Sequence, residues 1–361
     1  MSNNIIKNIL SHFDIPEDDY ELHTVAHGLI NTSYAVGQKS SGKNKYFLQK
    51  IDHIIFTDIA GLMNNIEVVC DHFNGLANPP QHLETLHTKD GSNYYKSAEG
   101  EYWRLYDFVG GNTFYRAEND QLASEAGNMF GDFLNALHSI DSSLLKTTIA
   151  RFHDIDFRYE QFLDSLKIAN AERKEKGRKI IELIENNISY VQDVYHEIVN
   201  TCPLIATHND TKLSNLLFDD QQHGICVVDY DTLMPGYLPL DFGDSVRTIC
   251  STTIEDDKNI DNTSFDLNIF GKFTTSFIKA LANSITDAEI KLLAKSAAYM
   301  PFLMGIRMFT DYLNNDTYYS TNYKEHNYDR AANQFTLFMS GMKLYNEMNI
   351  IVNNSKDHQP S

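Results

Sequence analysis

The stretch that decides the fold reads THNDTKLSNLLF and spans residues 207–218. It begins at the end of a short apolar run, 203–207, which is typical of a strand. A polar loop follows, in which Asp210 precedes Asn215 by five residues, and an apolar triplet then begins a further strand. An Asp and an Asn at this spacing are common in ordinary turns, so the pair gains meaning only from its surroundings.

A second acidic motif lies downstream, where the apolar run 225–228 leads into Asp229 in the sequence VVDYD. Asp229 follows Asn215 by fourteen residues, and the pattern between them predicts a small hairpin. Transfer of a phosphoryl group to a hydroxyl needs a carboxylate that accepts the proton, and oxygen ligands that hold Mg²⁺ against the phosphates of ATP. The carboxylates of Asp210 and Asp229 and the side-chain carbonyl of Asn215, all at loop ends, suit both tasks.

Upstream of these motifs the sequence predicts a small α+β region. Its expected strands are 20–25, 33–37, 45–51, 83–88, 93–97 and 102–108, and its expected helices are 3–13 and 58–73. The Asp-Gly pair at 90–91 predicts a hairpin between two of the strands. After a Gly-Gly pair at 110–111 the pattern becomes helical, over 119–138, 156–200 and from about 265 onward. We thus expect an N-terminal nucleotide-binding lobe, 1–108, and a C-terminal catalytic and substrate-binding lobe, 109–361.

Composition narrows the possible partners. The formal net charge of −19 argues against nucleic acid or acidic lipid as a main partner, because both would be repelled. It does not argue against ATP, which backbone N–H groups, a few cations and a metal ion hold locally. The four cysteines form no C-x-x-C pair, and we expect reduced, buried thiols. The sequence shows no evident signal peptide or membrane span, so we expect a cytoplasmic protein, a monomer or weak homodimer.

The combination of HNDxxxxN with a following VVD resembles the signature of the aminoglycoside phosphotransferase and choline kinase superfamily. Within it, the chain is most similar to the N-acetylhexosamine 1-kinases, through the stretches 207–212, 229–236, 241–247, 305–313 and 327–330. The resemblance implies an α+β, protein-kinase-like fold, with a small antiparallel-sheet lobe, a larger and mainly helical lobe, and ATP with Mg²⁺ between them. It also implies transfer of the γ-phosphoryl of ATP to the anomeric hydroxyl of an N-acetylhexosamine, either GlcNAc or GalNAc. By the same resemblance, Asp210 matches the catalytic base, and Asn215 and Asp229 match the magnesium ligands.

The resemblance also implies roles for residues of the small lobe. The turn that contains Gly28, Asn31 and Ser33 matches the loop that covers the phosphates, where a glycine allows close approach of the backbone. Kinase-like proteins usually carry a phosphate-holding Lys on the third strand, paired with a Glu of the next helix. Strand alternation places Gln49 at that position, with Glu67 as its helix partner, and leaves the phosphate-holding cation unassigned.

The remaining expectations concern adenine and the acceptor. The backbone of Leu105 to Asp107 lies where the hinge between the lobes should bind adenine. Asp231, Asp244 and Arg307 are candidates for contacting the sugar, because carboxylates bind hydroxyls and an Arg binds an acyl oxygen or a ring hydroxyl. An ion pair between Asp244 and Arg307 that joins helices is the competing interpretation.

Two bracing residues and an aromatic run complete the expectations. We expect His208 to support the catalytic loop by hydrogen bonding rather than to act as base, and Asp241 to brace the same loop. The tyrosine-rich run 317–323 either stacks on a sugar face or packs as a surface loop.

Three other functions stay open at this stage. The acceptor could be another small alcohol, such as an unacetylated sugar, an aminoglycoside, choline or homoserine. The acceptor could be a protein, although no clear A-P-E-like element follows Asp229. The protein could also be a non-catalytic nucleotide sensor, an interpretation whose only support is the missing Lys of the third strand.

Overall fold

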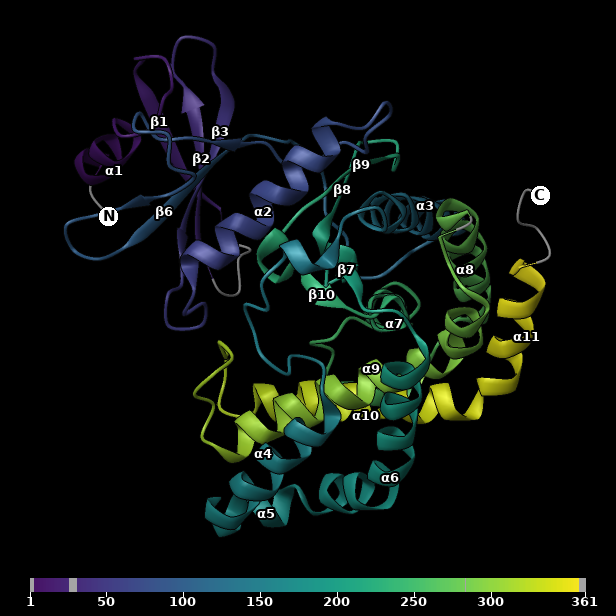
Figure 1. Ribbon diagram of the computed structural model, residues 1–361. Coiled ribbons are helices and arrows are strands. Elements are labelled where there is room, and N and C mark those ends of the chain that lie inside the picture. The colour runs from purple at the N-terminus through teal and green to yellow at the C-terminus, as the bar shows by residue number, and fades with distance from the viewer. Residues whose placement is uncertain (1–2, 26–30, 283, 357–361) are drawn as a thin grey trace.

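The small lobe is built on a twisted antiparallel sheet, shown at the upper left of Figure 1. The computed structural model describes residues 3–25, 31–282 and 284–356. Within them the sheet runs in the order β1-β2-β3-β6-β4, and β5 also pairs with β6. The strands are β1 (Tyr20–Val25), β2 (Thr32–Gln38), β3 (Lys43–Ile51), β4 (Thr85–Leu86), β5 (Tyr95–Lys96) and β6 (Tyr102–Asp107).

Side-chain alternation gives the two faces of this sheet different tasks. On one face, Leu48 and Trp103 join a core with helix α1 (Asn3–Leu10). On the other, Ile51 and Tyr106 join the core of helix α2 (Ile59–Asn74), which continues into the large lobe. Gln49 of β3 and Arg104 of β6 are directly opposite one another in the register. Their side chains therefore share the face that looks toward α2 and the large lobe.

Helix α2 is fixed to both lobes. Its N-cap is Asp58, whose side chain accepts a hydrogen bond from the Gly61 N–H. In its middle, the buried Asn65 amide donates to the carbonyl oxygens of Lys146 and Leu233, at 2.7 and 2.8 Å, and accepts from the Lys146 N–H. The helix that covers the sheet is thus bonded to two segments of the large lobe.

The large lobe is mainly helical. Helices α3 and α8 pack side by side, as do α9 and α10 (Figure 1). Two short antiparallel pairs, β7 with β10 and β8 with β9, lie next to the small lobe. The helices are α3 (Asp120–Leu137), α4 (Ile155–Ile168), α5 (Ala171–Lys176), α6 (Arg178–Thr201), α7 (Leu238–Ile249), α8 (Leu267–Leu281), α9 (Asp287–Leu313), α10 (His326–Lys343) and α11 (Tyr345–Lys356); the strands are β7 (Ile205–Thr207), β8 (Leu216–Phe218), β9 (Gly224–Val227) and β10 (Met234–Gly236).

The expected α+β kinase-like architecture is confirmed, with two local differences. The Asp-Gly pair at 90–91 forms a turn, but β4 and β5 each pair with β6 instead of with each other. The expected helix 156–200 is broken into α4, α5 and α6, because the backbone turns extended after Ile168 and Gly177 separates the next two helices. In the described part of the chain, no helix is long and apolar enough to cross a membrane.

Candidate active site

The catalytic loop follows strand β7 and is held from below by helix α7. The Asp241 carboxylate, in the first turn of α7, accepts the backbone N–H of His208 at 2.8 Å and that of Asn209 at 2.9 Å. Asn209 takes the left-handed backbone conformation, with φ 62°. Burial raises the pKa of Asp241 to about 8, although the two N–H bonds oppose this shift. The predicted bracing by Asp241 is therefore present.

His208 ties the loop to the strand that leads to Asp229. Its Nε2 bonds the Val228 carbonyl oxygen at 3.0 Å, and its Nδ1 accepts the Asp210 N–H at 3.3 Å. This arrangement needs the neutral tautomer with the proton on Nε2. Burial lowers the pKa of His208 and favours the same neutral form. The ring therefore braces the loop, as expected, and its nitrogens are not free to act as base.

The structure brings Asp210, Asn215 and Asp229 into one cluster. The Asn215 amide donates to the Asp210 carbonyl oxygen at 2.8 Å and to its Oδ2 at 3.1 Å. The ammonium of Lys212 lies 2.5 Å from Asp210 Oδ2 and 3.8 Å from Asp229 Oδ2. Lys212 was not among the predicted site residues, although its place two residues after Asp210 was an available signal. It is a cation located between the predicted base and a predicted metal ligand.

Electrostatics sets the charge states of this cluster. Burial opposes ionisation of Asp210, but Lys212 holds the pKa of that carboxyl below its usual value. Burial also favours the neutral Lys212 amine, yet Asp210 and Asp229 raise its pKa above the ordinary range. Desolvation raises the pKa of Asp229 to about 6, Asp231 and Asp210 add to this, and Lys212 opposes it. An added cation would therefore be stabilised most at Asp229.

The donor set fits a magnesium ion that is shared with phosphates. The Asn215 nitrogen is turned toward Asp210, which leaves Oδ1 for a metal, and the Asp229 side chain keeps 41% of its surface exposed. Among the described residues, no group of three or more His, Cys, Asp or Glu side chains could hold a metal ion. Mg²⁺ is commonly bound through one or two protein carboxylates together with substrate phosphates and water, so a two-ligand set suits it.

The polar residues of the small lobe form a network at the junction with the large lobe. Gln49 Nε2 donates to Ser33 Oγ at 3.0 Å, and Asn31 Oδ1 accepts the Asp52 N–H at 3.0 Å. Gly28, the predicted glycine of the phosphate-covering loop, lies outside the described residues. The nucleotide-binding roles of Asn31, Ser33 and Gln49 stay predictions.

Asp231 belongs to the same network and is not available to a sugar. Its Oδ1 forms an ion pair with Arg104 NH1, and its Oδ2 accepts from the Asn31 amide at 2.5 Å. Asp231 is only 4% exposed. The prediction that it contacts the acceptor is wrong, because both carboxylate oxygens are bonded to the small lobe.

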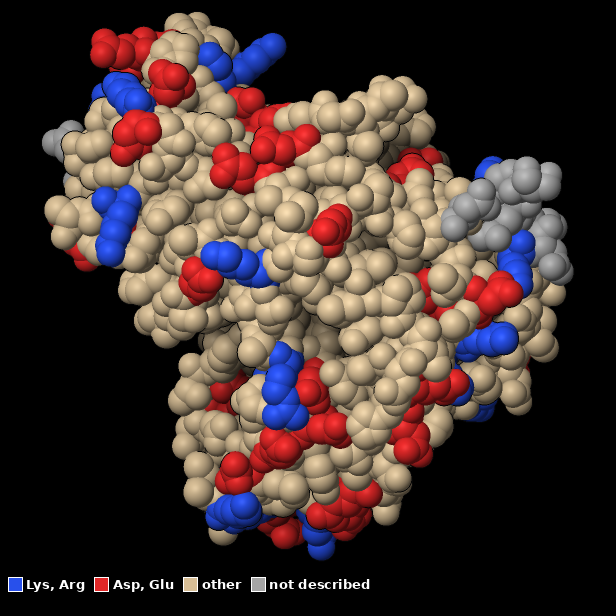
Figure 2. All heavy atoms as spheres, viewed as in Figure 1, with Lys and Arg blue, Asp and Glu red and all other residues tan. Residues whose placement is uncertain are grey.

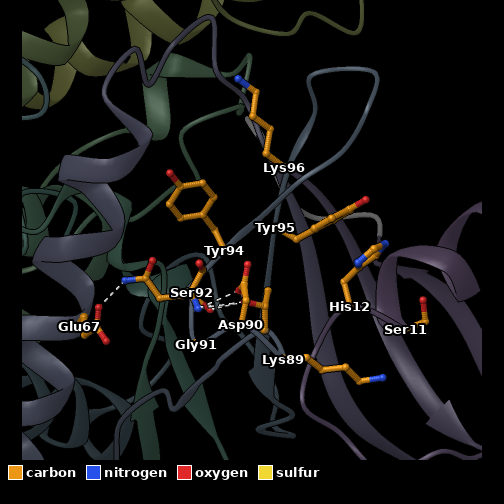
Figure 3. Close-up of a pocket in the computed structure, with 12 residues that line it drawn as sticks. Ser11, His12, Glu67, Lys89, Asp90, Gly91, Ser92, Tyr94, Tyr95 and Lys96 are labelled. Carbon is orange, nitrogen blue, oxygen red and sulfur yellow. Dashed lines mark hydrogen bonds between the residues drawn. The ribbon is translucent and has the colours of Figure 1, made fainter.

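Glu67 also has a different place from the one expected. It lines a cavity of about 610 Å³ between α2 and the segment before β5, shown in Figure 3. There its carboxylate accepts from the Asn93 amide and lies 3.2 Å from His87 Nε2. Gln49 bonds Ser33 and Arg104 instead. The predicted pairing of Glu67 with Gln49 is wrong, because the residue lies on another side of helix α2.

The hinge begins later than the sequence indicated. Leu105 faces Leu48 on one side and Leu86 on the other, so its backbone groups belong to the sheet. The Asp107 N–H donates to the Glu84 carbonyl oxygen. Leu105 is therefore wrong as an adenine contact, and Asp107 keeps only its carbonyl for that role.

The acceptor side carries buried polar atoms without partners. Asp244 Oδ1 lies 2.7 Å from Arg247 Nε, whereas its Oδ2 is buried and has no hydrogen-bond partner among the described residues. The same holds for His153 Nδ1 and for the Tyr319 hydroxyl. Buried polar groups are nearly always hydrogen-bonded, so such a set indicates a place for a polar ligand.

Arg307 lies beside Tyr319 of this set and has no carboxylate partner in the described part of the chain. Its guanidinium is 4.8 Å from the Phe152 ring centroid and 6.0 Å from that of Tyr319. The competing interpretation, an ion pair with Asp244, is wrong, since Asp244 pairs with Arg247. Burial and the nearby Arg307 lower the pKa of Arg158 to about 10. Burial, Arg307 and Arg158 lower that of His153 to about 3, while the charge of Asp210 acts the other way.

These pKa shifts show that the positive group is close to the catalytic loop. The two guanidiniums and the charge of Asp210 all act on His153. Figure 2 shows many acidic side chains on the outer surface of the molecule, in keeping with the net charge of −19. The acceptor side thus has a local charge opposite to that of the molecule as a whole.

Comparison with known proteins gives the class. The model of the phosphotransferase enzyme family (APH) matches residues 21–257, which is more than half of the chain. The chain belongs to this family, and the predicted resemblance is confirmed at that level.

Solved structures of similar proteins extend over nearly the whole chain. A microcompartment-associated aminopropanol kinase is 15% identical, with 96% of this chain and 99% of the other covered and a TM-score of 0.65. An aminoglycoside phosphotransferase from Alicyclobacillus acidocaldarius is 12% identical, with 98% of this chain and 96% of the other covered and a TM-score of 0.59. Choline kinase from Cryptosporidium parvum is 14% identical, with 98% of this chain and 99% of the other covered and a TM-score of 0.58. At such identities they support the shared fold and not a shared acceptor.

Proposed function

We propose that this phosphotransferase uses ATP and Mg²⁺ to phosphorylate the anomeric hydroxyl of an N-acetylhexosamine, GlcNAc or GalNAc, giving the sugar 1-phosphate and ADP. The observation that carries the acceptor class is a set of buried atoms without partners among the described residues: a carboxylate oxygen of Asp244, the hydroxyl of Tyr319, whose ring lies beside Arg307, and a nitrogen of His153. A sugar presents hydroxyls that both donate and accept, and its acetamido oxygen accepts from a guanidinium.

The residues of the catalytic loop divide the chemistry between them. Asp210 Oδ2 accepts the hydroxyl proton and orients the oxygen for attack. Asn215 Oδ1 and the Asp229 carboxylate would hold Mg²⁺, which when bound neutralises negative charge on the phosphates. Lys212 is released from Asp210 as the acceptor hydroxyl takes its place, and its ammonium then faces the phosphoryl group in transfer. Lys212 thus fills the place of the unassigned cation.

A second candidate is a kinase of an alcohol that carries an ammonium group, such as choline, an aminoglycoside or homoserine. The free oxygen of Asp244 favours it, because a buried carboxylate attracts an ammonium group. Arg307 and Arg158 disfavour it, since both are positively charged and neither has a carboxylate partner among the described residues. The two candidates make opposite predictions for substitution of Arg307 by a neutral residue, which should weaken sugar binding and strengthen cation binding.

Product analysis tests the proposal. The protein is incubated with ATP, Mg²⁺ and either N-acetylglucosamine or N-acetylgalactosamine, and the product is examined by phosphorus and proton NMR. We expect a phosphate coupled to the anomeric proton, and ADP in equal amount. Phosphate on another carbon would contradict the regiochemistry. Turnover of choline or kanamycin but not of the acetylated sugars would replace the acceptor.

The wider expectations accompany this proposal. We propose that the lobes divide at residues 108 and 109, near the end of strand β6 at Asp107. We also propose a cytoplasmic enzyme that acts as a monomer or weak homodimer.

A further inference from the structure

Arg104 is a buried cation whose nitrogens are all engaged by protein. It lies in the middle of strand β6 and is 1% exposed. Its Nε and NH2 donate to Gln49 Oε1, at 3.0 and 2.8 Å, so the fork of the guanidinium is fixed by the neighbouring strand β3. Its NH1 forms an ion pair with Asp231 of the large lobe. Arg104 is therefore held by Gln49 of the small lobe and paired with Asp231 of the large lobe.

Asp231 in turn fixes the segment that carries Asp229. The two residues are separated only by Tyr230, in a short 3₁₀ turn that spans Tyr230–Thr232. Asp229 precedes this turn with a left-handed backbone, φ 68° and ψ 63°. A non-glycine residue keeps such a conformation only where its surroundings enforce it. The ion pair with Arg104, together with the Asn31 amide, supplies that constraint from the small lobe.

The charges of the site point the same way. Asp210 and Asp231 are carboxylates close enough to Asp229 to raise its pKa. Lys212 compensates Asp210, and Arg104 compensates Asp231. Asp229 is left as the carboxylate without a close cation of its own, since Lys212 is 3.8 Å away. Without Arg104, Asp231 would add a second uncompensated negative charge next to the phosphates.

We propose that Arg104 is a positioning residue for the nucleotide: through Asp231 it joins the sheet of the small lobe to the metal-binding segment and keeps Asp229 ready for magnesium-bound phosphates. Arg104, on strand β6, thereby connects the sheet to the phosphate-binding site, a connection that a Lys on strand β3 usually makes in kinase-like proteins. This inference rests on the proposed role of Asp229 as metal ligand, but not on the identity of the acceptor.

Calorimetric binding of ADP, with and without Mg²⁺ and with no acceptor present, tests the inference. The variants are Arg104→Met, Arg104→Lys, Asp231→Asn and the double variant Arg104→Met/Asp231→Asn. Lys50→Met is the matched control, because Lys50 lies beside Gln49 on β3 and pairs with Glu101, 3.2 Å away, away from the site. Thermal unfolding of each variant shows whether it is folded.

We expect Arg104→Met to weaken magnesium-dependent ADP binding by roughly 10-fold or more. An effect of this size lies within the range of interaction energies measured for residues in contact. Arg104→Lys keeps the charge but loses the fork to Gln49, so its affinity should be intermediate. The double variant leaves neither charge buried alone, so it should fold even where Arg104→Met does not. It should bind more weakly than wild type by about 5-fold, and no more weakly than Arg104→Met. Lys50→Met should bind as wild type does.

Two results would overturn the inference. One is a folded Arg104→Met or double variant whose affinity for Mg·ADP lies within about 2-fold of wild type, below the range of a coupled pair. The other is an equal loss in Lys50→Met, which would assign the effect to the sheet in general. Failure of wild type itself to bind Mg·ADP is a different outcome, because it contradicts the proposed nucleotide function.

Discussion

Arg104 of strand β6 and Arg307 of helix α9 have opposite surroundings. Arg104 donates hydrogen bonds to Gln49 through Nε and NH2, and its NH1 forms an ion pair with Asp231. Arg307 has aromatic rings beside it, and among the residues that the structure describes its one hydrogen bond is to the Met304 sulfur, 3.3 Å away. The charge of Arg104 is therefore paired with a carboxylate of the protein, whereas Arg307 has no carboxylate partner among the described residues and keeps its charge for a ligand.

This difference suggests that the residues on the nucleotide side serve the transfer reaction and those on the acceptor side serve substrate specificity. Groups that hold one another in fixed positions suit the transfer step, which is the same for every acceptor. Buried polar groups that lack partners lower the affinity for any acceptor that cannot form hydrogen bonds with them. Such groups therefore select among acceptors. Substitutions on the nucleotide side should therefore change turnover or nucleotide affinity, and those on the acceptor side should change the acceptor KM.

The largest effect is expected for the base. Asp210→Asn keeps the shape of the side chain but cannot accept the hydroxyl proton, so kcat should fall by about 10³-fold. Binding of Mg·ADP, measured by calorimetry, should change far less than kcat. Activity above a tenth of the wild-type value would remove Asp210 from the role of base.

The next effect concerns the cation missed in the sequence. Lys212→Met removes a positive group between Asp210 and Asp229, so kcat should fall by about 10²-fold through lost stabilisation of the phosphoryl group. The KM for the acceptor should stay within about 3-fold of the wild-type value if Lys212 does not contact the acceptor. A change of that size is typical of a substitution that removes no contact. A variant with wild-type kcat would show that Lys212 only neutralises the loop.

A smaller effect, confined to the acceptor, is expected for Arg307. Arg307→Ala should raise the KM of the sugar by roughly 10- to 100-fold, because a charged hydrogen bond contributes about 1.5–3 kcal/mol. The ATP KM should stay nearly constant, and steady-state kinetics with each substrate varied in turn measures both. Equal increases in the two KM values, or unfolding, would show that Arg307 supports the fold and does not select the acceptor.

The smallest effect is a pH dependence of stability. The His153 pKa is about 3 in the folded protein, through burial and the charges of Arg307 and Arg158, against about 6.5 in the unfolded chain. Below pH 6.5 the unfolded chain binds a proton that the folded protein does not, so stability falls with falling pH.

This term amounts to about 1.4 kcal/mol per pH unit, or about 2 kcal/mol between pH 6.5 and 5. His153→Gln should show a shallower loss of unfolding free energy over that range, measured by urea denaturation. If the slope of unfolding free energy against pH were the same in His153→Gln and wild type, His153 would be able to bind a proton in the folded protein.

The catalytic loop could be predicted from sequence because its information is local. The spacing of Asp210, Asn215 and Asp229 follows from one loop and one hairpin, and the structure brings all three together. His208 and Asp241 brace the loop as expected, since short buried segments need partners for their polar groups.

The pairings between lobes could not be predicted in the same way. Periodicity shows which face of α2 is apolar, but not that Glu67 turns toward His87 and Asn93. Nothing in the residues around Arg104 indicates Asp231 as its partner, because that contact depends on how the lobes meet. Leu105 was assigned to the hinge because a strand's pattern does not show how many neighbours the strand has in the sheet.

The most direct test of the account is magnesium-dependent ADP release from ATP, with and without each acceptor of a panel. The panel contains N-acetylglucosamine, N-acetylgalactosamine, glucose, galactose, choline, homoserine and kanamycin. The account predicts strong stimulation by the acetylated sugars, weak or no stimulation by the cationic acceptors, and loss of stimulation in Asp210→Asn. Stimulation by choline or kanamycin alone would keep the catalytic loop but contradict the acceptor assignment, and no ADP release with any acceptor would contradict the central claim.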